Sequence, residues 1–150
     1  LAEGALRAPT FIHYPNAISN AGIDHTFMTV LDVLPTLLEI ADAGGPDDVQ
    51  IAGRAMQPLA GRSFWPLLTG EADTVHDQAS TAGWSRGLFG AVIRGRFKLV
   101  NQAPPGEPVS VTPPWQLYDI DADPGETRDL ATRYPEIVEQ LEAVWLRDWR

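Results

Sequence analysis

Three aspartates at alternate positions are the first residues of this chain whose types and spacing could do chemistry. They are Asp119, Asp121 and Asp123. Their spacing is that of the first three ligands of an EF-hand calcium loop, which also needs Gly at its sixth position and a bidentate Glu at its twelfth. Here those two positions hold Pro124 and Leu130. We therefore predict an Asx-type turn that caps a short helix around residues 127–132, and no metal site.

A second candidate is the segment GWSRG at residues 83–87, which matches the Gly-x-Ser-x-Gly elbow of serine hydrolases. In that fold the triad histidine follows the serine along the chain and a helix begins directly after it. All three histidines here precede Ser85, and strands are expected on both sides of it. We interpret Ser85 as a turn residue.

The histidines do not have the spacing of a metal site. No two of them lie three or four positions apart on a helix, and the chain has no cysteine to complete a shell. His76 beside Asp77 could form a pH-sensitive hydrogen-bonded pair, and a surface turn is the simpler interpretation. The sequence thus predicts neither a catalytic residue nor a metal ligand.

An acid-free stretch between Asp77 and Glu107 contains four basic residues: Arg86, Arg94, Arg96 and Lys98. They could attract an anionic substrate, or they could pair with acids on the protein's own surface. Trp84, close to Arg86, could stack on an aromatic or sugar ring, or it could pack in the core. We take Trp84 and Arg86 as candidate residues of a substrate rim.

The bulk composition limits the partners. The net charge of −9 over 150 residues argues against a nucleic-acid partner, because binding a phosphate backbone needs a basic surface. No apolar run approaches the roughly 20 residues that span a bilayer, so no membrane embedding is expected. The absence of cysteine excludes disulfides and leaves the compartment open.

The elements that must position these residues follow from hydrophobic periodicity. The apolar run at residues 8–15 predicts a buried strand, and Asp32 predicts the N-cap of a helix with Pro35 in its first turn. From residue 78 onward the period becomes two, which predicts four short strands at residues 78–84, 87–93, 96–102 and 115–120. A last helix beginning at Pro135 carries a wide apolar stripe that needs a sheet to cover.

The expected fold class is therefore α/β with an α+β lobe at the C-terminus. Residues 1–60 predict the edge strand and helix of a large α/β sheet whose remainder is absent. Residues 61–150 predict a small domain with a four-stranded antiparallel sheet packed on the C-terminal helix. We expect the truncated layer to leave apolar side chains exposed.

Five segments, in this order along the chain, resemble motifs of the sulfatases, most closely the bacterial arylsulfatases. They are EGALRAP with FIHYP (3–15), DVLPTLLEIA (32–41), GRSF with LL (61–68), IRGRFK (93–98) and LYD with DPGE (117–126). The resemblance covers most of the chain. It implies a C-terminal portion of a sulfatase, within the alkaline phosphatase superfamily.

What the resemblance implies about chemistry lies mostly outside this chain. The family hydrolyses sulfate esters with calcium and a formylglycine made within a Cys/Ser-x-Pro-x-Arg motif, which this chain lacks. We expect an arylsulfatase-like fragment, inactive alone, that supports the active-site domain and the substrate entrance. Its partners would be the missing N-terminal sulfatase domain and, through the intact parent, a small sulfate ester. Two alternatives stay open: part of a related phosphonate or phosphodiester metal hydrolase, and a free-standing non-catalytic binding module.

Overall fold

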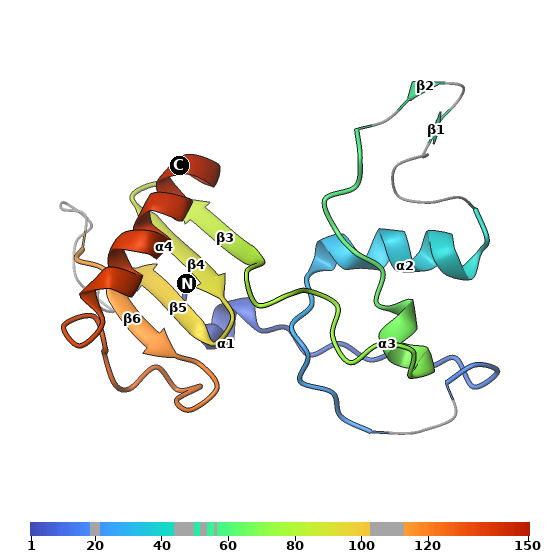
Figure 1. Cartoon of the computed structure of the whole chain (residues 1–150), viewed down its shortest axis with the longest axis horizontal. Helices are drawn as coiled ribbons and strands as arrows, with labels where there is room; N and C mark the ends of the chain where they lie inside the picture. Colours follow the sequence, from blue (N-terminus) through green and yellow to red (C-terminus); the bar gives the residue numbers. More distant parts are fainter. Residues whose placement is uncertain (19–21, 44–49, 52–53, 56, 103–112) are drawn as a thin grey trace. The chain divides into compact units, whose positions relative to one another are not determined.

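The protein is described by a computed structural model that covers residues 1–18, 22–43, 50–51, 54–55, 57–102 and 113–150 (Figure 1). These residues form two compact units. The sheet unit consists of Leu1–Thr10 and Gln78–Arg150, and the helical unit consists of Phe11–Asp77. The predicted boundary at residue 60 concerns the domains of a longer parent and stays a prediction.

Four antiparallel strands and one helix form the frame of the sheet unit. The strands pair in the order β3 (Thr81–Arg86), β4 (Phe89–Arg94), β5 (Phe97–Asn101) and β6 (Gln116–Asp119). The helix α4 (Pro135–Asp148) lies across one face of the sheet (Figure 1). Gly95 has a φ of +55° in the turn between β4 and β5, as the sequence predicts. The predicted fold class, with its four-stranded sheet on a C-terminal helix, is confirmed.

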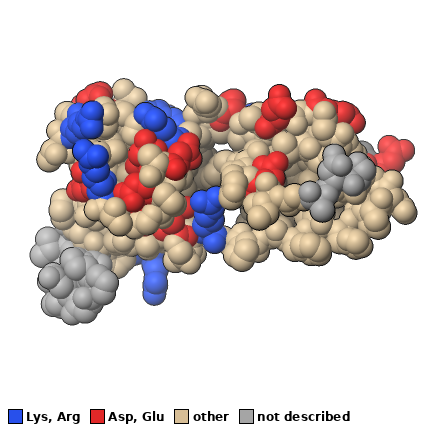
Figure 2. Space-filling view, turned by 90° about the horizontal axis from the view of Figure 1, so that it is seen from below, with Lys and Arg blue, Asp and Glu red and all other residues tan. Residues whose placement is uncertain are grey.

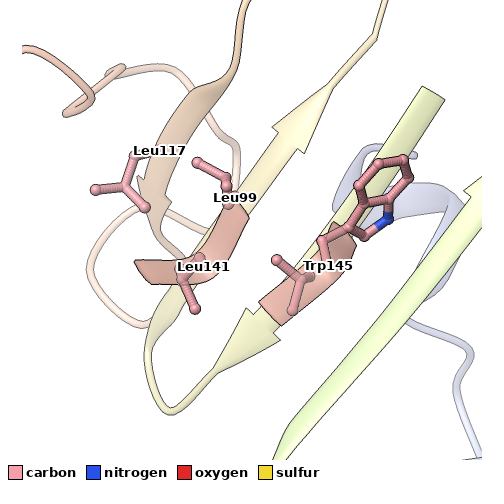
Figure 3. Packing of buried hydrophobic residues seen from close by; sticks show 5 residues of the cluster. Leu99, Leu117, Leu141 and Trp145 are labelled. Atoms are coloured by element: carbon pink, nitrogen blue, oxygen red, sulfur yellow. The ribbon is translucent and has the colours of Figure 1, made fainter. Parts of the chain in front are cut away.

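The main core lies between α4 and the sheet. Alternation along the strands places Val92, Leu99 and Leu117 on this face, which we call the helix face. Leu141 and Trp145 of α4 pack against them, and all five are at most 5% exposed (Figure 3).

Two glycines make room for aromatic rings on the helix face. A Cβ on Gly90 would lie 2.3 Å from the Trp145 ring, and a Cβ on Gly83 would lie 2.4 Å from the Trp149 ring. Glycine within a strand marks such a close approach. These two positions therefore set how near α4 comes to the sheet.

The opposite face of the sheet is covered by the N-terminal residues, so we call it the N-terminal face. Ala91, Val100 and Tyr118 form its buried cluster, and the side chains of Leu1 and Leu6 pack against it. A single helical turn, α1 (Glu3–Leu6), carries the second of these leucines. Residues 1–7 thus belong structurally with strands that begin more than seventy positions later.

The helical unit contains short elements. A 3₁₀ turn, η1 (Val30–Asp32), leads into α2 (Val33–Ile40), so the helix predicted after Asp32 is confirmed. The helix α3 (Trp65–Thr69) follows Ser63, whose Oγ accepts a hydrogen bond from Trp65 N at 3.1 Å. The remaining pair is β1 (Gln50–Ile51) with β2 (Arg54–Ala55).

The strand predicted at residues 8–15 is wrong for this chain. Residues 8–14 have no regular secondary structure, and Phe11 is 88% exposed. A strand needs a hydrogen-bonding neighbour, and an apolar run supplies only half of that requirement. Leu34 and Leu37 of α2 are also 49% and 56% exposed, so the predicted exposure of apolar side chains in this layer is confirmed.

Candidate functional site

Two of the three aspartates of the acidic turn, Asp119 and Asp123, accept local hydrogen bonds. Asp123 Oδ2 accepts from Thr127 N and Arg128 N, both at 2.8 Å, and Asp123 Oδ1 accepts from Thr127 Oγ1 at 3.0 Å. These bonds, the one from Arg128 N above all, lower the pKa of Asp123. Asp119 Oδ1 accepts from Ala122 N at 3.2 Å. The Asx-type turn is confirmed, but residues 127–134 contain turns and not the predicted short helix.

The residues present do not fit the calcium and formylglycine that the resemblance implies for a parent enzyme. The chain contains no cysteine and no Ser-x-Pro-x-Arg motif. Within the described ranges, no three His, Asp or Glu side chains come together as a metal-holding group. We therefore derive no catalytic step through either group.

Ser85 is a strand residue and not a turn residue, which corrects our interpretation. It lies in β3, is exposed, and pairs with Gly90 of β4. Gly87, with a φ of +63°, turns the chain directly into that strand. The surroundings are those of a hairpin and not of a nucleophile elbow.

A buried carboxylate organises the helical unit. Asp32 is 0% exposed and accepts four hydrogen bonds, which come from Thr29 N (2.6 Å), Thr29 Oγ1 (3.0 Å), Arg62 N (2.7 Å) and His76 Nε2 (2.9 Å). Burial favours the protonated carboxyl, but the hydrogen bonds from His76, Arg62 and Thr29 outweigh it and lower the pKa of Asp32. Because an ionised carboxylate only accepts, His76 Nε2 carries the hydrogen.

His76 was therefore placed wrongly by sequence. Its ring is only 12% exposed and pairs with Asp32, which lies 44 positions earlier, and not in a surface turn. The ring also packs edge-on against Phe27, with 5.8 Å between the centroids. The sequence did not predict the pairing of His76 with Asp32, because no local pattern links positions so far apart.

Asp32 and Thr36 together join two of the motif segments, DVLPTLLEIA and GRSF, since the Asp32 carboxylate accepts from Arg62 N at 2.7 Å. Thr36 Oγ1 donates to Asp32 O at 2.7 Å and accepts from Phe64 N at 2.9 Å. A Cβ at Gly61 would lie 2.0 Å from Leu31 O, so only glycine lets the two segments meet. In this chain, these motif residues connect residues 32–41 with residues 61–68.

Three further motif segments meet at a buried ion cluster, which consists of Glu3, Lys98 and Glu126. Lys98 is 0% exposed, and its Nζ donates to Glu3 Oε1 at 3.0 Å. The same ammonium lies 2.6 Å from Glu126 Oε1, an ion pair without hydrogen-bond angles, and Glu126 Oε2 accepts from Glu3 N at 3.0 Å. The sequence did carry a signal, since alternation places Lys98 on the same side as Val100, inside an apolar strand.

The basic residues do not form one patch. Arg94 Nη2 donates to Gln140 Oε1 at 2.9 Å, Arg96 Nη1 lies 3.4 Å from Asp119 Oδ2, and Lys98 is in the ion cluster. On the face seen in Figure 2, Lys and Arg side chains lie in several separate places with Asp and Glu between them. Of the two alternatives that the sequence leaves open, these three residues follow the second, because each contacts a side chain of the protein itself.

Trp84 and Arg86 lie on the edge strand β3. Trp84 is opposite Ala91 in the ladder, so its side chain is on the N-terminal face, and alternation places Arg86 on the same face. Trp84 is half-buried against the Ala91 cluster, and Arg86 is exposed. The two predicted rim residues are thus neighbours on one face, and a substrate role for them stays a prediction.

Comparison with known proteins finds sequence similarity to sulfatases. An uncharacterised sulfatase of Schizosaccharomyces pombe is 33% identical over 148 residues, which is 97% of this chain and 25% of the yeast protein. Arylsulfatase A of Bos taurus is 30% identical over 159 residues, 95% of this chain and 30% of the bovine protein. Arylsulfatase K of Canis lupus familiaris is 25% identical over 150 residues, 93% of this chain and 25% of that protein.

No family model matches the chain. A solved structure in complex with its substrate D-glucosamine-2-N,6-O-disulfate covers 77% of this chain at 20% identity, with a TM-score of 0.48. The chain spans about a quarter of the length of the curated relatives it matches. The chain is similar to sulfatases along most of its length, and the match is consistent with a C-terminal portion of a sulfatase.

Proposed function

We propose that this chain is the C-terminal part of a sulfuric ester hydrolase and that it is inactive by itself. The observation that carries the proposal is the similarity to sulfatases along 97% of the chain, over only 25% of the relative's length. In this proposal the rest of the parent supplies the nucleophile and the calcium ligands. Residues 1–60 complete its large α/β domain, and residues 61–150 form the small subdomain beside it.

The exposed apolar side chains of the helical unit support a covering partner. Phe11 and Ile23 are each 88% exposed, and Val30 and Leu31 are 83% and 58% exposed. Apolar side chains left in water at this density mark an interaction surface. We assign that surface to the N-terminal sulfatase domain, which disfavours a free-standing binding module.

The first test compares this chain with a longer product that includes the coding region upstream. Incubated with calcium and an aryl sulfate, the 150-residue chain should release no phenol, whereas the longer product should. Robust turnover by the short chain would refute the proposal. A longer product that hydrolyses an aryl phosphodiester and not the sulfate would favour the related metal hydrolases.

The second test concerns the substrate rim. In the longer product, Trp84→Ala and Arg86→Ala should each lower kcat/KM by roughly tenfold, the size expected when one binding contact is lost. Arg133→Ala is the matched control, because Arg133 is an exposed arginine of the sheet unit whose guanidinium packs on Tyr134, 5.3 Å from the ring centroid. Equal effects of Arg86→Ala and Arg133→Ala would remove Arg86 from the rim.

A further inference from the structure

The N-terminal residues contact the sheet unit through a small set of groups. Leu1 and Leu6 are the apolar contacts, and both are only half-buried. The helical turn α1 has four residues, and a helix of that length has no stability of its own in water. Other contacts must therefore fix residues 1–7 on this face.

The buried ion cluster supplies such contacts, in addition to the hydrogen bond that the Leu1 ammonium donates to Gln102 Oε1 at 2.8 Å. Lys98 Nζ lies 3.0 Å from Glu3 Oε1 and 2.6 Å from Glu126 Oε1, and Glu126 also accepts from Glu3 N. The side chains of Glu3 and Glu126 are 11% and 7% exposed, and that of Lys98 is 0% exposed. Leaving any one of these charges buried without its partners is costly, so the cluster forms as a whole or not at all.

The backbone at Glu126 is a second, independent sign that this carboxylate is needed. Glu126 has a φ of +53°, which lies in the left-handed region that favours glycine. The neighbouring Gly125 does not have a positive φ. This backbone conformation is unfavourable for a residue with a side chain, so it persists only where other interactions offset its free-energy cost. At Glu126 we assign that offset to the contacts of the carboxylate with Lys98 Nζ and with Glu3 N.

We propose that Glu3, Lys98 and Glu126 form a latch that fixes the position and register of residues 1–7 on the N-terminal face of the sheet. The latch joins one residue from each of three motif segments: EGALRAP, IRGRFK and DPGE. When the latch opens, all three charges return to water, so residues 1–7 can leave while the sheet and α4 stay folded. The proposal holds whichever ester the longer protein hydrolyses.

The decisive variant is Glu126→Gly, because it removes the carboxylate and at the same time relaxes the backbone. Hydrogen exchange of the 150-residue chain reports on Arg7 N, which donates to Glu3 O at 2.8 Å, and on Glu3 N. We expect exchange at these two amides to become at least about 100-fold faster, while amides of β4 and β5 keep their protection. Glu3→Gln should act in the same direction through the other carboxylate.

Lys98→Met keeps the length of the side chain and tests the cation, and Arg96→Met is the matched control. Arg96 lies 3.4 Å from Asp119 at a site where its side chain is 57% exposed, so its removal should leave the exchange of Glu3 and Arg7 unchanged. Unchanged or slower exchange in Glu126→Gly would overturn the latch. An equal loss of protection in β4 and β5 would also overturn it, because the cluster would then hold the whole sheet unit.

Discussion

Substituting Gly90 by alanine tests how closely α4 packs on the sheet. A Cβ at this position would lie 2.3 Å from Trp145 Cε2, so the ring must move by more than 1 Å to reach the roughly 3.5 Å of an ordinary contact. Trp145 is 5% exposed and packs edge-on against Trp115, with 5.3 Å between the centroids. The ring therefore has little room to move.

The expected cost combines three terms. Overpacking a well-packed core costs about 1–3 kcal/mol. Moving the ring also strains the hydrogen bond from Trp145 Nε1 to Trp84 O, 3.0 Å long, which contributes about 1 kcal/mol. Replacing a strand glycine by alanine returns about 0.5–1 kcal/mol of backbone entropy. The net loss is about 2 kcal/mol, which for a unit of this size lowers Tm by about 10 °C.

The assay is denaturant unfolding followed by the near-ultraviolet circular dichroism of the sheet-unit tryptophans. Gly4→Ala is the control, because nothing lies within 4 Å of a Cβ at Gly4. In a Trp145→Leu background, Gly90→Ala should cost about 1–2 kcal/mol less, since the ring that it meets is gone. If Gly90→Ala leaves the stability of the chain with Trp145 intact unchanged, or raises it, the packing argument is refuted.

Three further predictions concern other polar and glycine sites. Asp32→Asn should destabilise the helical unit by about 3 kcal/mol, measured through Trp65 fluorescence, because the amide cannot accept all four hydrogen bonds that the buried carboxylate accepts. Since folding lowers the pKa of Asp32, the stability that this carboxylate contributes is present above its unfolded pKa of about 3.9, and it is lost as pH falls through the lower folded pKa. Asp32→Asn should remove this part of the acid sensitivity, and an unchanged pH profile would contradict the assignment. Gly61→Ala should cost about 2 kcal/mol or more, since its Cβ would lie 2.0 Å from Leu31 O, and a wild-type melting curve would disprove that close approach. Asp123→Ala should loosen the acidic turn, seen as faster amide exchange there, and calcium should not change the Tm of the unsubstituted chain; a calcium-dependent rise would reopen a metal role.

Local patterns were sufficient for the strands β3 to β6 and the helix α4 of the sheet unit. The period of two on either side of Gly95 predicts a hairpin, and the stripe of α4 predicts a helix that packs on it. Both signals depend on neighbours within a few residues, which is the range over which a sequence pattern determines a face. The Asx-type turn at Asp123 was predictable for the same reason, since its bonds reach at most five positions.

The contacts that order the motif segments were not predictable in this way. His76 pairs with Asp32 across 44 positions, and Lys98 pairs with Glu3 across 95. Such pairings depend on how the chain returns on itself, and a single sequence does not contain that information. The close approach at Gly90 did leave a trace, because a glycine inside an apolar strand often marks a neighbouring ring.

The two units are held by different forces, and this difference follows from which apolar side chains find partners. In the sheet unit, α4 covers one face and residues 1–7 cover the other, so both apolar faces are buried. In the helical unit, Val30 and Leu37 remain more than half exposed, and the segments meet through Asp32. A polar network can fix geometry, but it contributes little net free energy compared with buried apolar area. The helical unit is therefore ordered in its connections and has few buried apolar side chains, which agrees with the proposed covering domain.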